Sequence, residues 1–299
     1  MHLNLIEASL GAALALAAAL VGLSDYTSSN RLVAIADTVE VGAVRIDYPR
    51  PGEFLAAGRA VAAPVEQITV SAFRIMKQQV SSAEYDRCVA ARACKPADVP
   101  AIEAADVPVA GVSYLDATAY ADWYSGETGY VWRLPTAEEV AAAAGERFSG
   151  NAFSAPFDDP ANPAVAWIKR YREEAAANRP AEPQLKPRGS YGANTNGVED
   201  FGGNVWEWTS TCYIRATLGP DTATVEHSTV NCGVHVLEGR HRAYMSNFIR
   251  DGKSGGCAVG TPPEHLGFRL VREDTPFPLR SLVMTRISAH LLSFRSSDS

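Results

Sequence analysis

The residues whose types and spacing best suit chemistry form one short run, from Asp200 to Cys212. Two acids, Asp200 and Glu207, bracket a glycine turn whose backbone can approach another group closely. A loop that folds back there would aim two carboxylates and its own carbonyl oxygens at one point, and Ca²⁺ prefers such hard oxygen ligands. The alternative is that the acids are solvated and that Trp206 and Trp208 belong to the core. Spacing alone favours the second interpretation.

Cysteine is the other chemically active residue type. Cys88 and Cys94 lie close together at the end of an expected helix, and Cys212 and Cys232 flank a polar loop, so two local disulfides are easily drawn and Cys257 is left over. Connectivity cannot be deduced from sequence, and buried free thiols are the alternative. Two such bridges would contribute roughly 2 and 3 kcal/mol in an oxidising compartment. No Cys-x-x-Cys or His-x-x-x-His spacing supports zinc.

The composition is that of a globular protein. The 299 residues are 46% hydrophobic and 20% charged, which is enough to bury a core in one large or two small domains. The net charge is −7, and no basic run of useful length is present, so a nucleic acid is not an expected partner.

The chain begins with an almost continuously apolar segment, residues 3–23. At 1.5 Å per residue this is roughly enough for one membrane crossing. A cleaved signal peptide and an uncleaved anchor both fit, and both imply export to a periplasmic or extracellular location. No small-x-small cleavage site follows, and only His2 precedes the apolar core. A buried Ala/Leu helix of a cytosolic protein is the alternative.

Short strands and capped helices are the elements that must position these residues. Apolar alternation predicts strands over 38–48 and 67–75, and another over the tryptophans that follow the glycine turn. Three capping-box patterns predict helix starts. In such a box the side chain three positions on accepts a hydrogen bond from the backbone N–H of the cap residue. The caps are Ser81, Ser113 and Thr136.

The rest of the chain is less regular. Residues 147–197 are rich in Pro, Asn, Asp and Gly, with one expected helix over 164–177, and long irregular stretches in a compact domain are usually functional or stabilised by a ligand. A strand is expected over 266–271. The tail beyond it has helical spacing with arginines off the apolar face, which favours docking or disorder over a membrane-surface helix.

An ordered set of motifs resembles one family. Arg133-Leu134-Pro135-Thr136, then Gly203-Asn204-Val205-Trp206-Glu207-Trp208, then Leu266-Gly267-Phe268-Arg269 together resemble the formylglycine-generating enzyme, or sulfatase-modifying-factor, family. Gly52-Glu53-Phe54, Val80-Ser81-Ser82-Ala83-Glu84-Tyr85 and the segment 108–117 resemble its earlier part. The resemblance implies an α+β domain with a variant of the C-type-lectin fold and low regular secondary structure. It divides the chain into 1–24, an apolar signal or anchor segment, 25–43, a linker with the first strand, 44–272, the domain, and 273–299, a tail.

The resemblance also implies a structural calcium ion at the run described first. The matching ligands would be the side chains of Asp200 and Glu207 and the carbonyls of Gly203 and Val205. The family's second calcium site has no clean match between 148 and 197.

The chain departs from the family where the family does its chemistry. Members that make formylglycine bind copper(I) through two cysteines that follow a Gly-Gly-Ser stretch, and the matching segment 236–250 contains no cysteine. Copper or iron is therefore not expected. The segment instead carries a polar, basic cluster that would line the substrate cleft and could recognise a carboxylate or phosphate. Its members are Arg240, His241, Arg242, Tyr244, Asn247, Arg250 and Asp251.

The bland alternative for this cluster is a charged surface with a local Arg250–Asp251 ion pair. If any catalysis remains, the candidates are His241, Tyr244 and Cys257. The sequence thus predicts an exported, membrane-tethered accessory or maturation protein that acts on an exported protein or peptide, as relatives that accompany copper nitrite reductases imply. The alternatives are a metal-dependent oxidoreductase for a peptide or siderophore-like substrate, and a ligand-binding lectin-like module.

Overall fold

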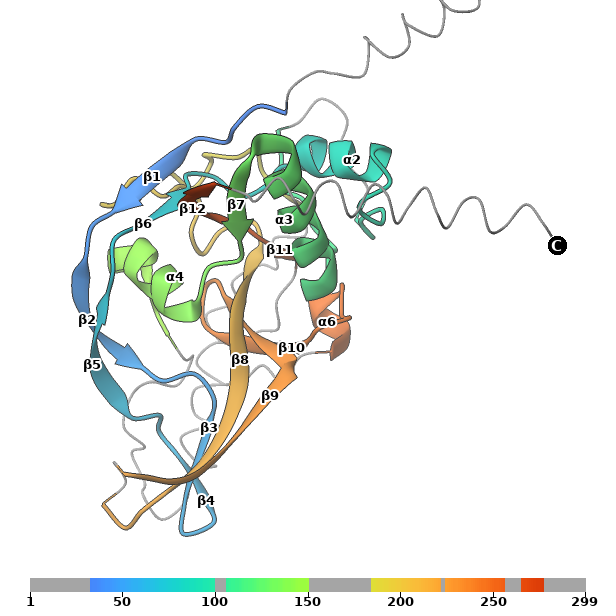
Figure 1. Ribbon diagram of the computed structural model, residues 1–299. Helices are drawn as coiled ribbons and strands as arrows, with labels where there is room; N and C mark the ends of the chain where they lie inside the picture. The colour runs from blue at the N-terminus through green and yellow to red at the C-terminus, as the bar shows by residue number, and fades with distance from the viewer. Residues whose placement is uncertain (1–32, 100–105, 151–183, 222–223, 256–264, 277–299) are drawn as a thin grey trace, which may run out of the picture. The chain divides into compact units, whose positions relative to one another are not determined.

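A long antiparallel pair of strands, β8 (Trp206–Leu218) and β9 (Val225–Glu238), forms the centre of the largest sheet (Figure 1). The computed structural model describes residues 33–99, 106–150, 184–221, 224–255 and 265–276. In this sheet β10 adds to β9, and β3 and β11 run parallel to β8. Its other strands are β3 (Glu53–Ala56), β4 (Arg59–Val61), β10 (Ala243–Ser246) and β11 (Leu266–Gly267).

A second sheet has the order β1-β6-β12-β7, and a separate ribbon pairs β2 with β5. The expected strand 38–48 is divided into β1 and β2, and the expected strand 67–75 into β5 and β6. The division arises because the two halves pair differently: β1 and β6 join the sheet, whereas β2 and β5 pair with each other. The bounds are β1 (Thr38–Val41), β2 (Val44–Pro49), β5 (Val65–Val70), β6 (Phe73–Met76), β7 (Tyr130–Arg133) and β12 (Val271–Pro276).

The expected strand 266–271 is interrupted for a similar reason. Its first residues form β11 beside β8, and β12 continues in the other sheet. Phe268, Arg269 and Leu270 lie between them and are buried. The chain therefore crosses from one sheet to the other at Arg269, whose side chain points into the interior.

The three predicted helix starts are confirmed. Ser81, Ser113 and Thr136 each accept a hydrogen bond from the backbone N–H three residues on, and the carboxylate at that position accepts one from the backbone N–H of the cap residue. Each such cap stabilises its helix by about 1 kcal/mol. The helices are α2 (Ser82–Ala90), α3 (Tyr114–Thr128), α4 (Ala137–Ala144), a short 3₁₀ turn η1 (Gly145–Arg147) and α6 (Gly252–Gly255).

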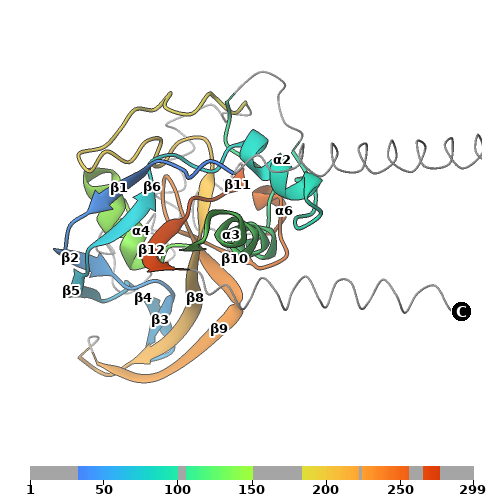
Figure 2. The same ribbon diagram turned by 45° about the horizontal axis from the view of Figure 1, so that its top comes forward.

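The core lies between these helices and the sheets. α4 packs beside the β2–β5 ribbon and β8, as both views show (Figures 1 and 2). α3 contributes Tyr120, whose ring stacks on Tyr85 of α2 at 5.8 Å between centroids and meets Phe268 edge-on. Few helices beside curled sheets, with long connections, make an α+β fold, as the sequence predicted.

Several expected features fall outside the described residues: the apolar segment 3–23, the helix 164–177, Cys257 and the tail beyond 276. Residues Met1–Ile35 separate from Ala36–Ser299 as a unit of their own, and all the strands and helices given above belong to the second unit. Within the described ranges, no helix combines the length and apolarity that a membrane crossing needs.

Candidate functional site

The turn that begins at Asp200 is fixed by buried polar contacts. Asp200 adopts a positive φ of 57° and Gly202 one of 75°, so the chain reverses sharply before β8. The Asp200 carboxylate is fully buried and accepts hydrogen bonds from the backbone N–H groups of Gly189 and Tyr191, the second at 2.7 Å. The Asp200 side chain thus fastens the preceding loop to the turn.

Glu207, on β8, forms a buried ion pair with Arg269. Both side chains are 1% exposed, and the two contacts measure 2.6 and 2.7 Å, so the pairing is bidentate. The remaining guanidinium donors reach the carbonyls of Met76, Lys77 and Glu199. Burying two charges is costly unless geometry and further hydrogen bonds compensate, and here every arginine nitrogen has an acceptor.

The side-chain amide nitrogen of Gln79 contacts three oxygens of this region. Its Nε2 donates to Glu207 Oε1 at 2.9 Å and lies 3.2 Å from the Gly203 carbonyl and 3.4 Å from the Asp200 carbonyl. Its Oε1 is buried and has no partner among the described residues. The two ends of an amide are nearly equal in shape. A half-turn of the amide would therefore bring its oxygen close to the other three, and a cation would offset the repulsion among four neighbouring oxygens.

Such a set fits calcium, which takes carboxylate, carbonyl and amide oxygens. It differs from the expected set, because Asp200 contacts the Gln79 amide with its carbonyl while its carboxylate binds the Gly189–Tyr191 loop. Of the other expected ligands, the Gly203 carbonyl and the Glu207 carboxylate both contact the Gln79 amide. Val205 is buried, and its N–H donates to the Gly203 carbonyl at 2.7 Å.

Both predicted disulfides are present. Cys88–Cys94 closes the end of α2, and Cys212–Cys232 joins β8 to β9. Cys88 and Cys94 are buried, whereas Cys232 is exposed and Cys212 is partly exposed.

Arg242 does not line an open cleft, contrary to the expectation for the basic cluster. Its side chain is 0% exposed and pairs with Glu238 at 2.7 Å, while Nη1 donates to the Pro49 carbonyl. The guanidinium lies over the rings of Tyr48 and Phe148. Burial raises the pKa of Glu238, and Arg242 only partly opposes this rise.

Arg250 is also held internally. It grips both carboxylate oxygens of Asp116, at 2.8 and 2.7 Å, and reaches Asp98 at 2.8 Å. The alternative interpretation of the cluster gave Arg250 a local ion pair with Asp251, whereas the ion pairs of Arg250 described here are with Asp98 and Asp116. Asp251 accepts the backbone N–H of Lys253. Burial acts to raise the pKa of Asp116, but the hydrogen bonds from Arg250 and Ser113 outweigh it and hold this pKa below its usual value.

The other members of the cluster have partners elsewhere in the fold. His241 is 6% exposed, and its Nδ1 lies 2.9 Å from the carbonyl of Arg242. The Arg240 guanidinium lies over the Trp206 ring, and the Tyr244 hydroxyl accepts the N–H of Gly52 at 2.7 Å. Burial raises the pKa of Tyr244. The described part of the segment 239–251 therefore does not form a single basic surface.

Asn247 leads to a group that the sequence did not single out. Its Oδ1 lies 2.7 Å from Nδ1 of His235, and its Nδ2 donates to the Cys232 carbonyl at 2.8 Å. His235 is 3% exposed, stacks on Tyr114 at 3.7 Å, and points Nε2 at Cys212 Sγ, 3.8 Å away. Burial lowers the pKa of His235, and the Asn247 contact opposes this. In the sequence, the alternation of the strand that carries Cys212 was the only pattern that pointed to this group of residues.

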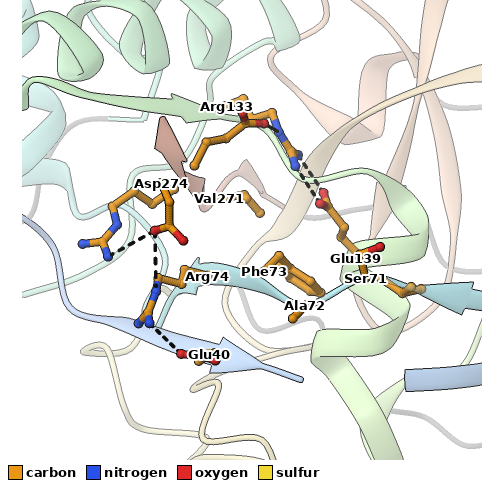
Figure 3. A pocket seen from close by; sticks show the side chains of 12 residues that line it. Glu40, Ser71, Ala72, Phe73, Arg74, Arg133, Glu139, Val271 and Asp274 are labelled. Carbon is orange, nitrogen blue, oxygen red and sulfur yellow. Dashed lines mark hydrogen bonds and ion pairs between the residues drawn. The ribbon is translucent and has the colours of Figure 1, made fainter. Parts of the chain in front are cut away.

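A surface hollow of about 370 Å³ is lined by residues outside the segment 239–251 (Figure 3). Its charged rim is paired internally: Arg74 contacts Glu40 at 2.6 Å, and Arg133 contacts Glu139 at 2.6 Å. In the described ranges, no three His, Cys, Asp or Glu side chains are placed to hold one metal ion.

Comparison with known proteins finds one similar enzyme and several similar solved structures. A formylglycine-generating enzyme of Streptomyces coelicolor is 29% identical over 174 residues, which are 56% of this chain and 52% of the enzyme. The chain thus spans about half the length of that curated relative. Among solved structures, PvdO from Pseudomonas aeruginosa aligns with 22% identity and a TM-score of 0.47 over 80% of this chain and 94% of its own. Treponema denticola variable protein 1 aligns with 15% identity and a TM-score of 0.45 over 79% and 94% of the two chains.

The model of the sulfatase-modifying factor enzyme 1-like domain matches residues 38–274, which extend from β1 to β12. The chain therefore belongs to the sulfatase-modifying factor, or formylglycine-generating enzyme, family.

Proposed function

We propose that this protein is an accessory or maturation protein for an exported partner and that it does not make formylglycine. The observation that carries the proposal is the absence of any cysteine from residues 236–250. The only sulfur in that segment is the thioether of Met245, which is fully buried. Two thiolates cannot bind copper(I) there, and neither the Tyr244 nor the Ser246 hydroxyl is a soft ligand.

The arginines of the segment give further support. Arg242 and Arg250 use their donors on Glu238, Asp116 and Asp98, so their charges stabilise the fold and leave little for a small anionic substrate. The most exposed residue of the segment is apolar: Phe248 is 72% exposed. Leu115 of α3, whose N–H donates to the Asn247 carbonyl, is 56% exposed. Exposed apolar side chains side by side suit contact with a protein.

Export is the second part of the proposal. Two disulfides within one domain require an oxidising compartment to form and persist. The apolar segment 3–23 would deliver the domain there and, if uncleaved, would hold it at the membrane. We propose a periplasmic copper enzyme such as nitrite reductase as the partner, on the resemblance to relatives that accompany such enzymes.

The test compares this protein with an active formylglycine-generating enzyme. Purified protein is loaded with copper(I), given a cysteine-containing peptide, and assayed for thiol loss and aldehyde formation. We expect no turnover and no copper(I) retained against a chelator. Turnover, or stoichiometric copper that His241→Ala removes, would establish the oxidoreductase alternative instead.

Partner binding is tested separately with purified copper nitrite reductase. Phe248→Ser should weaken a measured complex several-fold, whereas Val65→Ser, at a 64% exposed site on β5, is the matched control. If the two variants bind equally well, the surface around Phe248 is not the contact.

We also propose that Glu207, Gly203, Asp200 and Gln79 bind a structural calcium ion through the oxygens described above. Chelation should then lower the melting temperature, and Gln79→Leu should weaken calcium binding in a titration followed by calorimetry. Gln78→Leu is the control, because that side chain contacts Glu199 instead. An unchanged melting curve on chelation would refute calcium binding.

A further inference from the structure

The Cys212–Cys232 bridge has an ionisable neighbour and an accessible sulfur. In the β8–β9 ladder Cys212 lies opposite His235, and the ladder then shifts so that Tyr213 lies opposite Asn231. Cys232 lies in this irregular stretch of β9 and is exposed. Cys212 therefore has a covalent partner at the surface and an imidazole 3.8 Å from its sulfur on the inner side.

Asn247 determines which imidazole nitrogen faces the sulfur. The Asn247 Nδ2 donates to the Cys232 carbonyl at 2.8 Å, so its Oδ1 must be the atom 2.7 Å from His235 Nδ1. An amide oxygen only accepts, and Nδ1 therefore carries the proton. The Nε2 that faces Cys212 is then free to gain a proton when negative charge develops on that sulfur.

The surroundings of the bridge suit an extended peptide. The β10 strand pairs with β9 only at residues 234–237, and Asn247 extends this side by donating to the carbonyls of Gly233 and Cys232. Residues 225–231 of β9 are therefore paired on one side alone within the described structure. Nearly all of this stretch is exposed. An open strand edge can accept an added strand, which would bring a cysteine of that strand beside Cys232.

We propose that Cys212–Cys232 is a thiol–disulfide exchange site that accepts electrons from a dithiol on an exported protein, with His235 carrying the proton of Cys212. A partner thiol attacks Cys232 Sγ, the S–S bond breaks, and Cys212 leaves as a thiolate. The proton lost by the attacking thiol is taken up at His235 Nε2, which leaves a Cys212 thiolate beside an imidazolium. The partner's second thiol then attacks the partner's sulfur in the mixed disulfide, and Cys232 leaves as the thiolate. Cys232 takes up the proton of that second thiol, and the His235 imidazolium passes its proton to Cys212.

The balance is complete: the partner's dithiol becomes a disulfide with loss of two electrons and two protons, and the bridge becomes two thiols. The imidazolium lowers the pKa of the leaving thiol, and a lower pKa makes a thiolate leave faster. The two cysteines and His235 lie outside the segment 236–250, and the exchange goes beyond the proposed accessory role.

The other disulfide provides an internal control. The intact full-length protein is incubated with reduced glutathione, quenched with acid and alkylated, and each bridge is followed by mass spectrometry. We expect Cys212–Cys232 to open at least about ten-fold faster than the buried Cys88–Cys94 bridge. The trapped glutathione adduct should be on Cys232 and not on Cys212.

The imidazole is tested by His235→Phe, which keeps a ring against Tyr114. We expect this change to slow opening of Cys212–Cys232 by about ten-fold and to leave Cys88–Cys94 unchanged. Tyr114→Phe keeps the stacking partner and should leave both rates unchanged. If His235→Phe fails to fold, Asn247→Ala should slow the same bridge by removing the support of Nδ1–H.

Equal opening rates for the two bridges, an adduct on Cys212, or a normal rate in both the His235 and Asn247 variants would overturn the proposal. Each of these outcomes is independent of nitrite reductase binding. Failure here therefore leaves the accessory role to its own test.

Discussion

Two buried carboxylate–guanidinium pairs lie side by side, and they are built differently. Glu207 and Glu238 face each other across β8 and β9, and each has its own arginine. Arg269 grips Glu207 with two bonds and uses its other donors on three carbonyls. Arg242 makes one bond to Glu238, and its Nη2 has no partner in the described part of the chain.

The difference shows what each pair does. Glu207–Arg269 joins the point where the chain crosses between the sheets to the turn at Asp200, and its hydrogen bonds are complete. Glu238–Arg242 relies on the faces of Tyr48 and Phe148 and belongs to the segment that departs from the family. The pair whose hydrogen bonds are complete belongs to the motifs that identify the family. The pair with an unpartnered nitrogen belongs to the region where this chain departs from the family.

The largest expected effect comes from Arg269→Met. This change leaves Glu207 buried without its cation, which costs ~3–5 kcal/mol of unfolding free energy. Urea unfolding measures it. A loss below about 1 kcal/mol would show that the Gln79 amide or a bound cation already satisfies Glu207.

Arg242→Met should cost less, about 2 kcal/mol at neutral pH. Burial raises the pKa of Glu238, so the folded state retains a proton more readily than the unfolded chain does. A raised folded pKa means that stability falls as pH rises through that pKa. The cost of the variant should therefore shrink in acid, where Glu238 is neutral. Unfolding at several pH values tests this, and a cost independent of pH would contradict it.

The partly exposed pair Asp116–Arg250 should contribute less to the free energy of unfolding. Its contribution should depend on pH in the opposite direction to that of Glu238. The folded pKa of Asp116 lies below its unfolded value, so its contribution is present above the unfolded pKa of about 3.9 and is lost as pH falls through the folded pKa. We expect about 1 kcal/mol. Asp116→Asn should flatten this part of the stability profile. An unchanged profile would mean that Arg250 does not stabilise the ionised form.

The smallest effect is expected at the surface. Arg74 and Glu40 are 37% and 58% exposed, and Glu40→Gln should change the stability by less than about 0.5 kcal/mol. Thermal unfolding at low and high salt checks this value. A larger effect would indicate that the rim of the hollow in Figure 3 acts as a network with Asp274.

The features that the sequence predicted well are local. A cap and its acid lie three residues apart, as at Ser113 and Asp116, so one turn of chain determines both hydrogen bonds. The cysteines of each bridge flank a single helix end or a single pair of strands. Motif order was sufficient for the family and the α+β fold, because the same short segments recur in sequence.

The features that failed depend on distant partners. Arg242 looks like a surface cation, and only Pro49, Tyr48 and Phe148 bury it. The strand 38–48 was predicted as one element, although its apolar alternation changes phase between Val41 and Val44. Its halves pair with β6 and β5 in different sheets. Gln79 has no local feature that points to Glu207, since 128 positions separate them.

The position of β6 between β1 and β12 has a mechanical consequence. Both neighbours are antiparallel to β6, so the first and last strands of the domain run in the same direction. A pull on the start of β1 and the end of β12 would draw them in opposite directions along a common axis. The two ladders would then be loaded in shear, with their hydrogen bonds strained together instead of peeled one at a time. A domain held at one end should therefore resist extension by force.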